Sequence, residues 1–269
     1  MLKKIVIKKA IADLMYGAAS FLRAEPAKGG FRALCYHSIT DGPVEDDHYQ
    51  MTTPKGTFEA QMRYLYESGH SVMSCDEIVD KMENGIALPP KALSITFDDG
   101  FRDILTNAAP ILMKYGFKST VFLPVDFIGK SRQYLDLGEA RELLRTGVFS
   151  AGSHSMSHAN LHNIAPEDAA REAGSSRRIL EDRLMTDIRL FAYPYGGYGA
   201  FNKTTMDILK AGGYKAAFTT IAGYNRPDRD LYALKRTRIC WFDDEDNFMK
   251  ELQGAYDWYE IWQKIIRTP

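Results

Sequence analysis

The stretch K-A-L-S-I-T-F-D-D-G, residues 91–100, is the part of the sequence that decides the fold. It follows the chain-breaking pair Pro89-Pro90, continues through mostly apolar residues, and ends in two adjacent aspartates and a glycine. An apolar run of this length between turn-forming residues predicts a buried strand that ends at Asp98. Gly100 allows the chain to turn sharply directly after the strand.

Strands and helices are expected to alternate on both sides of this strand. Further strands are expected at 31–37, 119–124, 148–152, 189–194 and 214–220, and helices at 57–69, 75–85, 104–116, 139–145, 167–185, 204–213 and 246–265. Such alternation predicts an α/β fold with a parallel sheet and crossover helices. About seven strand–helix units in one chain favour a (β/α) barrel over an open sheet.

Polar residues follow three of the expected strands. Asp98 and Asp99 end the first, His154 follows V-F-S-A-G, and Tyr195 follows R-L-F-A-Y-P. Ligands of parallel α/β folds gather where strands end and loops begin. These residues therefore predict the functional face of the sheet.

Two adjacent carboxylates at the end of a buried strand repel each other and are costly to bury together. A cation or a shared proton would relieve that repulsion. The alternative for Asp98 and Asp99 is an Asp-Asp-Gly turn with two solvated side chains.

The segment G-S-H-S-M-S-H-A-N-L, residues 152–161, holds two histidines at i and i+4. On a helical turn His154 and His158 would face one side, where they could bind one metal ion. Two histidines and one carboxylate form a triad that leaves positions open for water and substrate. The alternative is a pair of surface histidines, or one hydrogen-bonded histidine in the core.

The segment R-L-F-A-Y-P-Y-G, residues 189–196, ends in an unusual turn set by Pro194 and Gly196. Such a turn can point the backbone N–H of Tyr195 into a cleft, where it could stabilise a developing oxyanion. Taken alone, the segment is equally an aromatic strand that ends in a turn.

In this order, T-F-D-D-G, H-S-x-x-H-x-x-L and F-x-Y-P-Y-G resemble the polysaccharide deacetylase family, the NodB-homology domain of carbohydrate esterase family 4. The resemblance covers about residues 31–262, and the Y-H of L-C-Y-H-S-I (34–39) resembles the branch that deacetylates poly-N-acetylglucosamine. It implies a distorted (β/α) barrel of the NodB type with a divalent metal, usually Zn²⁺. It also implies an N-acetylated glycan as the substrate.

The resemblance implies roles for individual residues. Asp99, His154 and His158 would hold the metal, and Asp98 would be the general base that takes a proton as water attacks. The Tyr195 N–H and the metal would share the oxyanion.

The sequence departs from the family pattern at two points. Ala192 stands where many members have an arginine that orients the base, so an arginine from elsewhere is expected to do so. Arg238 is the first candidate and Arg236 the second, with surface charge as the alternative. No histidine follows His162, so the late general-acid histidine is missing. His37 could replace it, His37 could instead make a structural hydrogen bond, or Asp98 could carry both protons.

Residues 1–30 are expected to be an N-terminal extension and residues 31–269 the catalytic domain. The basic start M-L-K-K-I-V-I-K-K-A could begin an amphipathic helix on an anionic membrane surface, or an ordinary helix packed on the domain. The three cysteines show no C-x-x-C spacing, which favours a reducing compartment, and we expect the cytoplasm, at or near the inner membrane face. The net charge of −1 argues against a nucleic-acid partner.

The motifs favour removal of an acetyl group from an N-acetylated sugar in a cell-envelope glycan, an exopolysaccharide or a lipid-linked precursor. The alternatives are a deformylase or deacetylase of a small or lipid-carried sugar, and an inactive glycan-binding domain. A glycosidase is disfavoured because its two carboxylates flank the bond about 5 Å or more apart.

Overall fold

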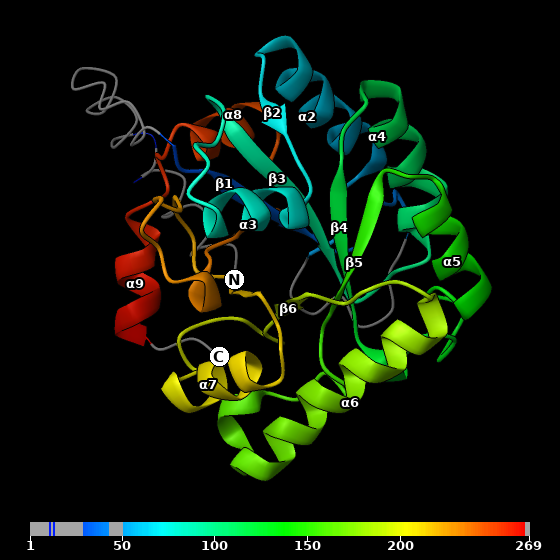
Figure 1. Cartoon of the computed structure of the whole chain (residues 1–269). Helices are drawn as coiled ribbons and strands as arrows, with labels where there is room; N and C mark the ends of the chain where they lie inside the picture. Colours follow the sequence, from blue (N-terminus) through cyan, green and yellow to red (C-terminus); the bar gives the residue numbers. More distant parts are fainter. Residues whose placement is uncertain (1–10, 12, 14–28, 43–50, 267–269) are drawn as a thin grey trace.

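The computed structural model describes residues 11, 13, 29–42 and 51–266. Its centre is one sheet whose strands all pair in parallel, in the order β7-β6-β5-β4-β3-β1-β8, with β2 beside β3 (Figure 1). The strands are β1 (Arg32–Tyr36), β2 (Ser71–Val72), β3 (Ala92–Asp98), β4 (Ser119–Leu123), β5 (Phe149–Ser153), β6 (Leu190–Ala192), β7 (Ala216–Phe218) and β8 (Thr237–Arg238). The expected parallel sheet is confirmed.

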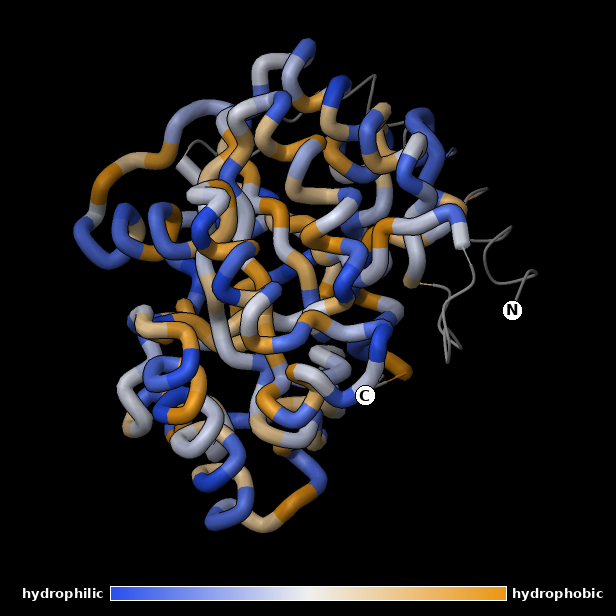
Figure 2. The backbone as a smooth tube through the Cα atoms, turned by 90° about the vertical axis from the view of Figure 1, so that its right-hand side faces the viewer, coloured by the Kyte–Doolittle hydropathy of each residue, from blue (hydrophilic) through white to orange (hydrophobic). Residues whose placement is uncertain are grey.

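Helices connect the strands and cover the outside of the sheet (Figure 1). They are α2 (Lys55–Glu67), α3 (Cys75–Glu83), α4 (Ala109–Tyr115), α5 (Leu137–Arg145), α6 (Pro166–Leu184), α7 (Lys203–Ala211), α8 (Glu245–Leu252) and α9 (Tyr259–Ile266). Short helical turns are η1 (Ile104–Ala108), η2 (Val125–Phe127), η3 (Leu161–Asn163) and η4 (Leu231–Ala233). Hydrophilic and hydrophobic residues alternate along the outer helices, as expected of helices with one face on a core (Figure 2).

The single C-terminal helix expected at 246–265 is wrong, because the chain forms α8 and α9 with a break between them. Gly254 adopts a left-handed conformation (φ +83°), and its N–H donates to the carbonyl of Glu251. A left-handed glycine just past a helix ends it, because the next N–H groups no longer point along the helix axis. The break lets α9 pack elsewhere on the barrel.

One short segment, residues 234–238, connects the two ends of the strand order. Leu234 bridges Phe218 of β7, while Thr237 pairs with Leu34 and Arg238 with Cys35 of β1. The sheet therefore curves round until only this segment separates β7 from β1. Such closure through a single bridge and a two-residue pairing is the distortion expected of the barrel.

The alternation of side chains along β3 separates an apolar face from a polar one. Leu93, Ile95 and Phe97 belong to the core between the sheet and the helices. Thr96 and Asp98 are also buried, but the period of two along a strand points them to the opposite, inner side. The polar residues of this strand therefore line the inside of the barrel.

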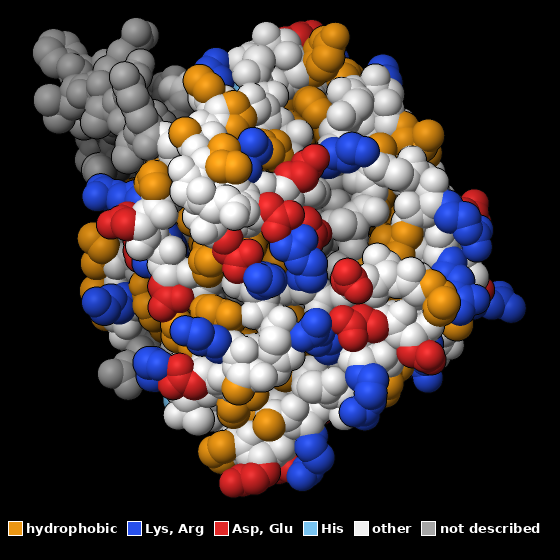
Figure 3. All heavy atoms as spheres, in the orientation of Figure 1, with side chains coloured by type: hydrophobic (Ala, Val, Ile, Leu, Met, Phe, Trp, Pro, Cys, Tyr) orange, Lys and Arg blue, Asp and Glu red, His pale blue; other side chains and the backbone are white. Residues whose placement is uncertain are grey.

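The N-terminal extension lies almost entirely outside the described residues, so the expected membrane-surface helix stays a prediction. Of its described residues, Asp13 accepts a hydrogen bond from Lys250 Nζ of α8 at 2.6 Å. Within the described ranges, no helix has the length and apolar character needed to cross a bilayer. Acidic and basic side chains are interspersed over the face shown in Figure 3.

Gly152 of β5 tests how tightly the strand before His154 is packed. A Cβ there would lie 2.5 Å from the ring of Phe122 and 3.1 Å from the carbonyl oxygen of Leu190. We expect Gly152→Ala to lower the free energy of unfolding by about 1–3 kcal/mol through overpacking. Denaturant unfolding measures the change.

Gly174→Ala is the matched control, because a Cβ at this position of α6 meets nothing within 4 Å. It should raise the free energy of unfolding by about 0.5–1 kcal/mol, since alanine favours a helix interior over glycine. Equal effects of the two substitutions would contradict the packing described for β5.

Candidate active site

The two aspartates separate because the backbone turns between them. Asp98 is the last residue of β3, whereas Asp99 and Gly100 both adopt left-handed conformations at φ +69°. A non-glycine residue in this region carries strain of about 1–3 kcal/mol, which the surroundings must offset. The turn is further constrained because a Cβ at Gly100 would lie 2.6 Å from Leu123 Cδ2. Sequence neighbours thus have different environments.

The two histidines come from the loop after β5, and the expected helical turn is wrong. Ser155 (φ +68°) and His158 (φ +64°) are left-handed, which a helix excludes. The His154 N–H donates to the carbonyl of Leu123, and the His158 N–H donates to Ser155 Oγ. The Glu172 carboxylate of α6 accepts hydrogen bonds from the backbone N–H groups of 156 and 157. A strained, anchored loop therefore brings the imidazoles together, with ring centroids 4.9 Å apart.

Asp99, His154 and His158 converge at one point. Asp99 Oδ1 lies 3.7 Å from His154 Nε2 and 3.4 Å from His158 Nε2. This oxygen is buried and accepts no hydrogen bond from the described residues. An unpaired buried carboxylate oxygen facing two imidazole nitrogens is the environment that a divalent cation satisfies.

The protonation states of the two histidines suit metal ligands. Burial lowers the pKa of His154 to about 3 and also lowers the pKa of His158, so both rings are neutral at pH 7. His154 Nδ1 pairs with the Ala192 carbonyl at 2.7 Å. A carbonyl only accepts, so Nδ1 carries the hydrogen and Nε2 offers its lone pair. Burial and the charge of Asp98 raise the pKa of Asp99 to about 8. A bound cation would offset this cost of ionising Asp99.

Asp98 is held by Arg236 through two parallel hydrogen bonds. Arg236 Nη1 donates to Asp98 Oδ1 at 2.6 Å and Nη2 donates to Oδ2 at 2.7 Å, and the arginine is fully buried. Its Nε donates to the Thr219 carbonyl, and its guanidinium lies 5.1 Å from the ring centroid of Phe122. Burial alone would raise the pKa of Asp98, but the charge and hydrogen bonds of Arg236, together with His154 and His37, outweigh burial and hold that pKa well below its usual range. Asp98 is therefore an anion with a fixed orientation.

The expectation that Arg238 orients Asp98 is wrong, because the arginine in contact is Arg236. The two arginines have the same parity on one extended segment, so the alternation of side chains could not distinguish them. The register places Arg238 level with Cys35, nearer the ends of the strands, and its charge acts on His37. Arg236 lies two residues deeper, and its long side chain reaches Asp98 along the inside of the barrel.

Cys35 of β1 and His37, which directly follows that strand, lie beside Asp98. Ligand atoms of these three residues lie within 4.8 Å of one another, and Cys35 Sγ donates to Asp98 Oδ2 at 3.3 Å. Burial, opposed by the charge of Asp98, lowers the pKa of His37 to about 4. His37 Nδ1 is buried and makes no hydrogen bond with the described residues. The sequence motifs gave Cys35 no role at the site, although its position two residues before His37 in the strand expected at 31–37 places both on one face.

Tyr195 adopts a left-handed conformation (φ +66°) in the turn after β6, and its ring lies 5.0 Å from that of His158. Among the described residues, no acceptor is bonded to its backbone N–H. An unpaired N–H beside the histidines is available to a ligand. Phe127 of η2 also stacks on His158, with ring centroids 5.6 Å apart, a contact that no sequence motif indicated.

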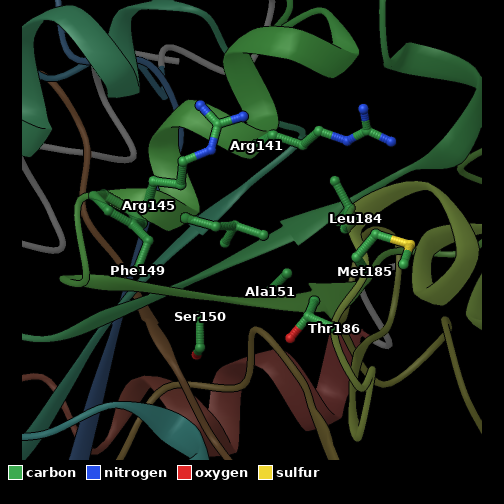
Figure 4. Close-up of a pocket in the computed structure, with 9 residues that line it drawn as sticks. Arg141, Arg145, Phe149, Ser150, Ala151, Leu184, Met185 and Thr186 are labelled. Atoms are coloured by element: carbon green, nitrogen blue, oxygen red, sulfur yellow. The ribbon is translucent and has the colours of Figure 1, made fainter.

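A cavity at the opposite ends of the strands is separate from this site. Arg141 and Arg145 of α5 stand over the beginning of β5, and Met185 and Thr186 beyond α6 complete the rim (Figure 4). His154 follows the other end of the same strand, so the cavity takes no part in the chemistry of the aspartates and histidines.

Comparison with known proteins gives one family. Residues 85–217 match the family model described as polysaccharide deacetylase. The putative polysaccharide deacetylase YxkH of Bacillus subtilis is 31% identical over 218 residues, which cover 80% of this chain and 72% of the relative. The poly-beta-1,6-N-acetyl-D-glucosamine N-deacetylase of Staphylococcus epidermidis is 26% identical over 232 residues, which cover 81% and 77%.

Two solved structures share the fold. The Streptococcus pyogenes deacetylase PplD, in complex with acetate, has a TM-score of 0.75 at 24% identity and covers 84% of this chain and 99% of its own. IcaB from Ammonifex degensii has a TM-score of 0.71 at 24% identity and covers 85% and 97%.

The contacts of Asp98 predict different effects of its two neighbouring arginines. Arg236→Met should lower the free energy of unfolding by about 3–5 kcal/mol, because it leaves a buried carboxylate without its counter-charge. The matched substitution Arg238→Met should change it by about 1 kcal/mol or less. Denaturant unfolding at pH 7 measures both.

The double variant Asp98→Leu/Arg236→Met should recover part of that loss, because it removes both charges. If Arg238→Met lowered the free energy of unfolding as much as Arg236→Met, the pairing of Arg236 with Asp98 would be wrong.

Proposed function

Since the chain belongs to the polysaccharide deacetylase family, we propose that it removes the acetyl group from an N-acetylated sugar in a metal-dependent reaction. The substrate is a bacterial cell-envelope glycan or exopolysaccharide, or its lipid-linked precursor. The observation that carries this proposal is the unpaired Asp99 oxygen between His154 and His158, next to an Asp98 carboxylate held by Arg236.

Asp99, His154 and His158 are the residues that would hold the metal. One carboxylate and two neutral imidazoles form a mixed oxygen and nitrogen ligand set that suits Zn²⁺ and leaves positions open. A divalent cation in such a site supplies Lewis acidity, which acidifies water and polarises carbonyl oxygens.

Asp98 is the general base of this proposal. It stays ionised at neutral pH, and the bidentate contact with Arg236 fixes the direction of its carboxylate. From that position it accepts a proton from the water that attacks the acetamide carbon. The Tyr195 N–H donates to the carbonyl oxygen as that oxygen becomes negative.

His37 delivers a proton to the departing amine in this proposal. Its low pKa makes it neutral in the resting protein, so it must first gain the proton, and Asp98 within 4.8 Å is the nearby source. An amine is a poor leaving group unless it is protonated, so this transfer completes the cleavage of the C–N bond.

The identity of the sugar is supported by the relatives. The Staphylococcus epidermidis relative is named for poly-beta-1,6-N-acetyl-D-glucosamine, and this chain matches 77% of its length. We therefore propose β-1,6-linked N-acetylglucosamine as the first substrate to test.

Acetate release tests the reaction and its metal. Oligomers of β-1,6- and β-1,4-linked N-acetylglucosamine and a lipid-linked N-acetylglucosamine form the panel. We expect acetate release that a chelator abolishes and Zn²⁺ restores, and Asp98→Asn should reduce kcat by about 10²-fold or more. Zn²⁺ should raise the melting temperature of the wild type and of Asp98→Asn, but not of Asp99→Asn.

If no member of the panel released acetate in the presence of Zn²⁺, the proposed activity would be wrong, and a glycan-binding domain would be the remaining interpretation. If the protein hydrolysed the lipid-linked sugar faster than every oligomer, the proposed substrate would be the lipid-linked precursor and not the polymer.

The leaving group tests the role of His37. His37→Gln should reduce acetamide hydrolysis by about 10²-fold or more, because the amine then leaves without a proton. The same variant should hydrolyse 4-nitrophenyl acetate nearly as fast as the wild type, since nitrophenolate leaves unprotonated. Steady-state rates on both substrates give the comparison.

His162→Gln is the control for that experiment, because His162 pairs with Asn202 on the surface. Equal losses on the amide and the ester in His37→Gln would exclude His37 as the general acid.

A further inference from the structure

Two consecutive threonines, Thr219 and Thr220, directly follow β7. They lie between Arg236, which binds Asp98, and the turn that holds Tyr195. Thr219 is fully buried and Thr220 is 7% exposed. Neither belongs to the cluster of Asp99, His154 and His158. Their hydrogen bonds nevertheless reach both halves of the site.

Thr220 holds the Tyr195 turn through its side chain and its backbone. Its hydroxyl donates to the Tyr195 carbonyl at 2.7 Å, and its N–H donates to the Gly196 carbonyl at 2.8 Å. The two segments are in close contact, because a Cβ at Gly196 would lie 2.7 Å from both Thr220 Cγ2 and Thr220 N. These contacts anchor the turn in which Tyr195 has its strained left-handed conformation.

Thr219 holds the arginine on the other side. Its carbonyl accepts a hydrogen bond from Arg236 Nε at 3.0 Å. Its own N–H and hydroxyl both donate to the Leu234 carbonyl, at 2.7 and 3.0 Å, and so attach it to the segment that carries Arg236. The guanidinium of Arg236 is thereby fixed from two sides, because Nε binds Thr219 and both Nη atoms bind Asp98.

Helix α9 supports the threonines from outside the barrel. Gln263 is 3% exposed, although Ile261 and Ile265 on the same helix are 65% and 71% exposed. Its Nε2 donates to the Thr220 carbonyl at 2.9 Å, and its Oε1 accepts from the Ala222 N–H at 2.9 Å. The buried amide of Gln263 therefore satisfies two backbone groups of the loop that follows β7.

We propose that Thr220 is a positioning residue, whose hydroxyl orients the Tyr195 N–H toward the oxyanion, and that Gln263 of α9 holds Thr220 in place for this task. The inference rests on the proposed function, since it assumes that the Tyr195 N–H stabilises the oxyanion. A displaced donor weakens the interaction in the transition state more than substrate binding.

Thr220→Val and Thr220→Ser separate the hydroxyl from the packing. We expect Thr220→Val to lower kcat for acetate release by about 10- to 100-fold with KM changed less than about threefold. Thr220→Ser keeps the donor and should retain kcat within about threefold, although it loses the methyl group that packs on Gly196. The Kd for Zn²⁺, measured by chelator competition, should be the same in both variants.

Gln263→Met provides a second variant if Thr220→Val does not fold, as judged by its melting temperature. It should lower kcat by about three- to tenfold with KM and the Kd for Zn²⁺ unchanged. Thr146→Val removes a comparable hydroxyl-to-carbonyl bond at the end of α5, remote from the site, and should leave kcat unchanged.

The inference is overturned if the folded Thr220→Val or Gln263→Met protein keeps wild-type kcat, or if Thr220→Ser loses as much as Thr220→Val. The latter result would assign the effect to packing. Absence of acetate release from the wild type would instead overturn the proposed function, so the two failures are distinguishable.

Discussion

The ion pair between Arg236 and Asp98 is the interaction on which the site depends. Moving two charges out of water costs several kcal/mol for each ion, and good geometry with further hydrogen bonds must offset that cost. Here the contact is bidentate, and the remaining donors of Arg236 reach Thr219 and Thr96. The arginine can only stand there because residues 234–238 lie between β7 and β1. The segment that closes the barrel therefore also orients the Asp98 carboxylate.

Adjacent aspartates acquire opposite properties from this arrangement. Asp98 has a buried counter-charge and a lowered pKa, whereas Asp99 is buried beside Asp98 and has a pKa raised to about 8. The left-handed turn at Asp99 gives the second carboxylate a different set of neighbours, the two histidines. One side chain is satisfied by protein, and the other has an oxygen that no described residue satisfies. This difference is the physical basis for separating proton transfer from metal binding.

Backbone strain is concentrated at the same place. Of the six non-glycine residues with positive φ among those described, Asp99, Ser155, His158 and Tyr195 belong to the three loops that form the site, and the other two, Lys91 and Met185, lie elsewhere. Each such residue carries strain of about 1–3 kcal/mol. Anchors fix these loops: Glu172 bonds the histidine loop, and Thr220 bonds the Tyr195 turn. The site is therefore held in its shape before any ligand arrives, which is what transition-state stabilisation by fixed donors requires.

The sequence by itself determined the alternation of strands and helices, the parallel sheet, and the three strand ends at which the polar motifs stand. Those features depend on the local periodicity of apolar residues and on turn residues such as Gly100. It could not separate Arg236 from Arg238, because two residues of equal parity on one segment give the same pattern. It also predicted a helical turn for the histidine pair, where Ser155 Oγ and the Glu172 carboxylate accept backbone hydrogen bonds that stabilise a left-handed loop.

Only the tertiary structure decided which distant groups meet. Arg236 and Asp98 are 138 residues apart in sequence, and Gln263 and Thr220 are 43 apart. Contacts of this kind depend on strand register and on how the barrel closes, neither of which leaves a local trace in the sequence. The stretch around Asp98 therefore indicated where the chemistry lies, and the fold decided which arginine, cysteine and threonine surround it.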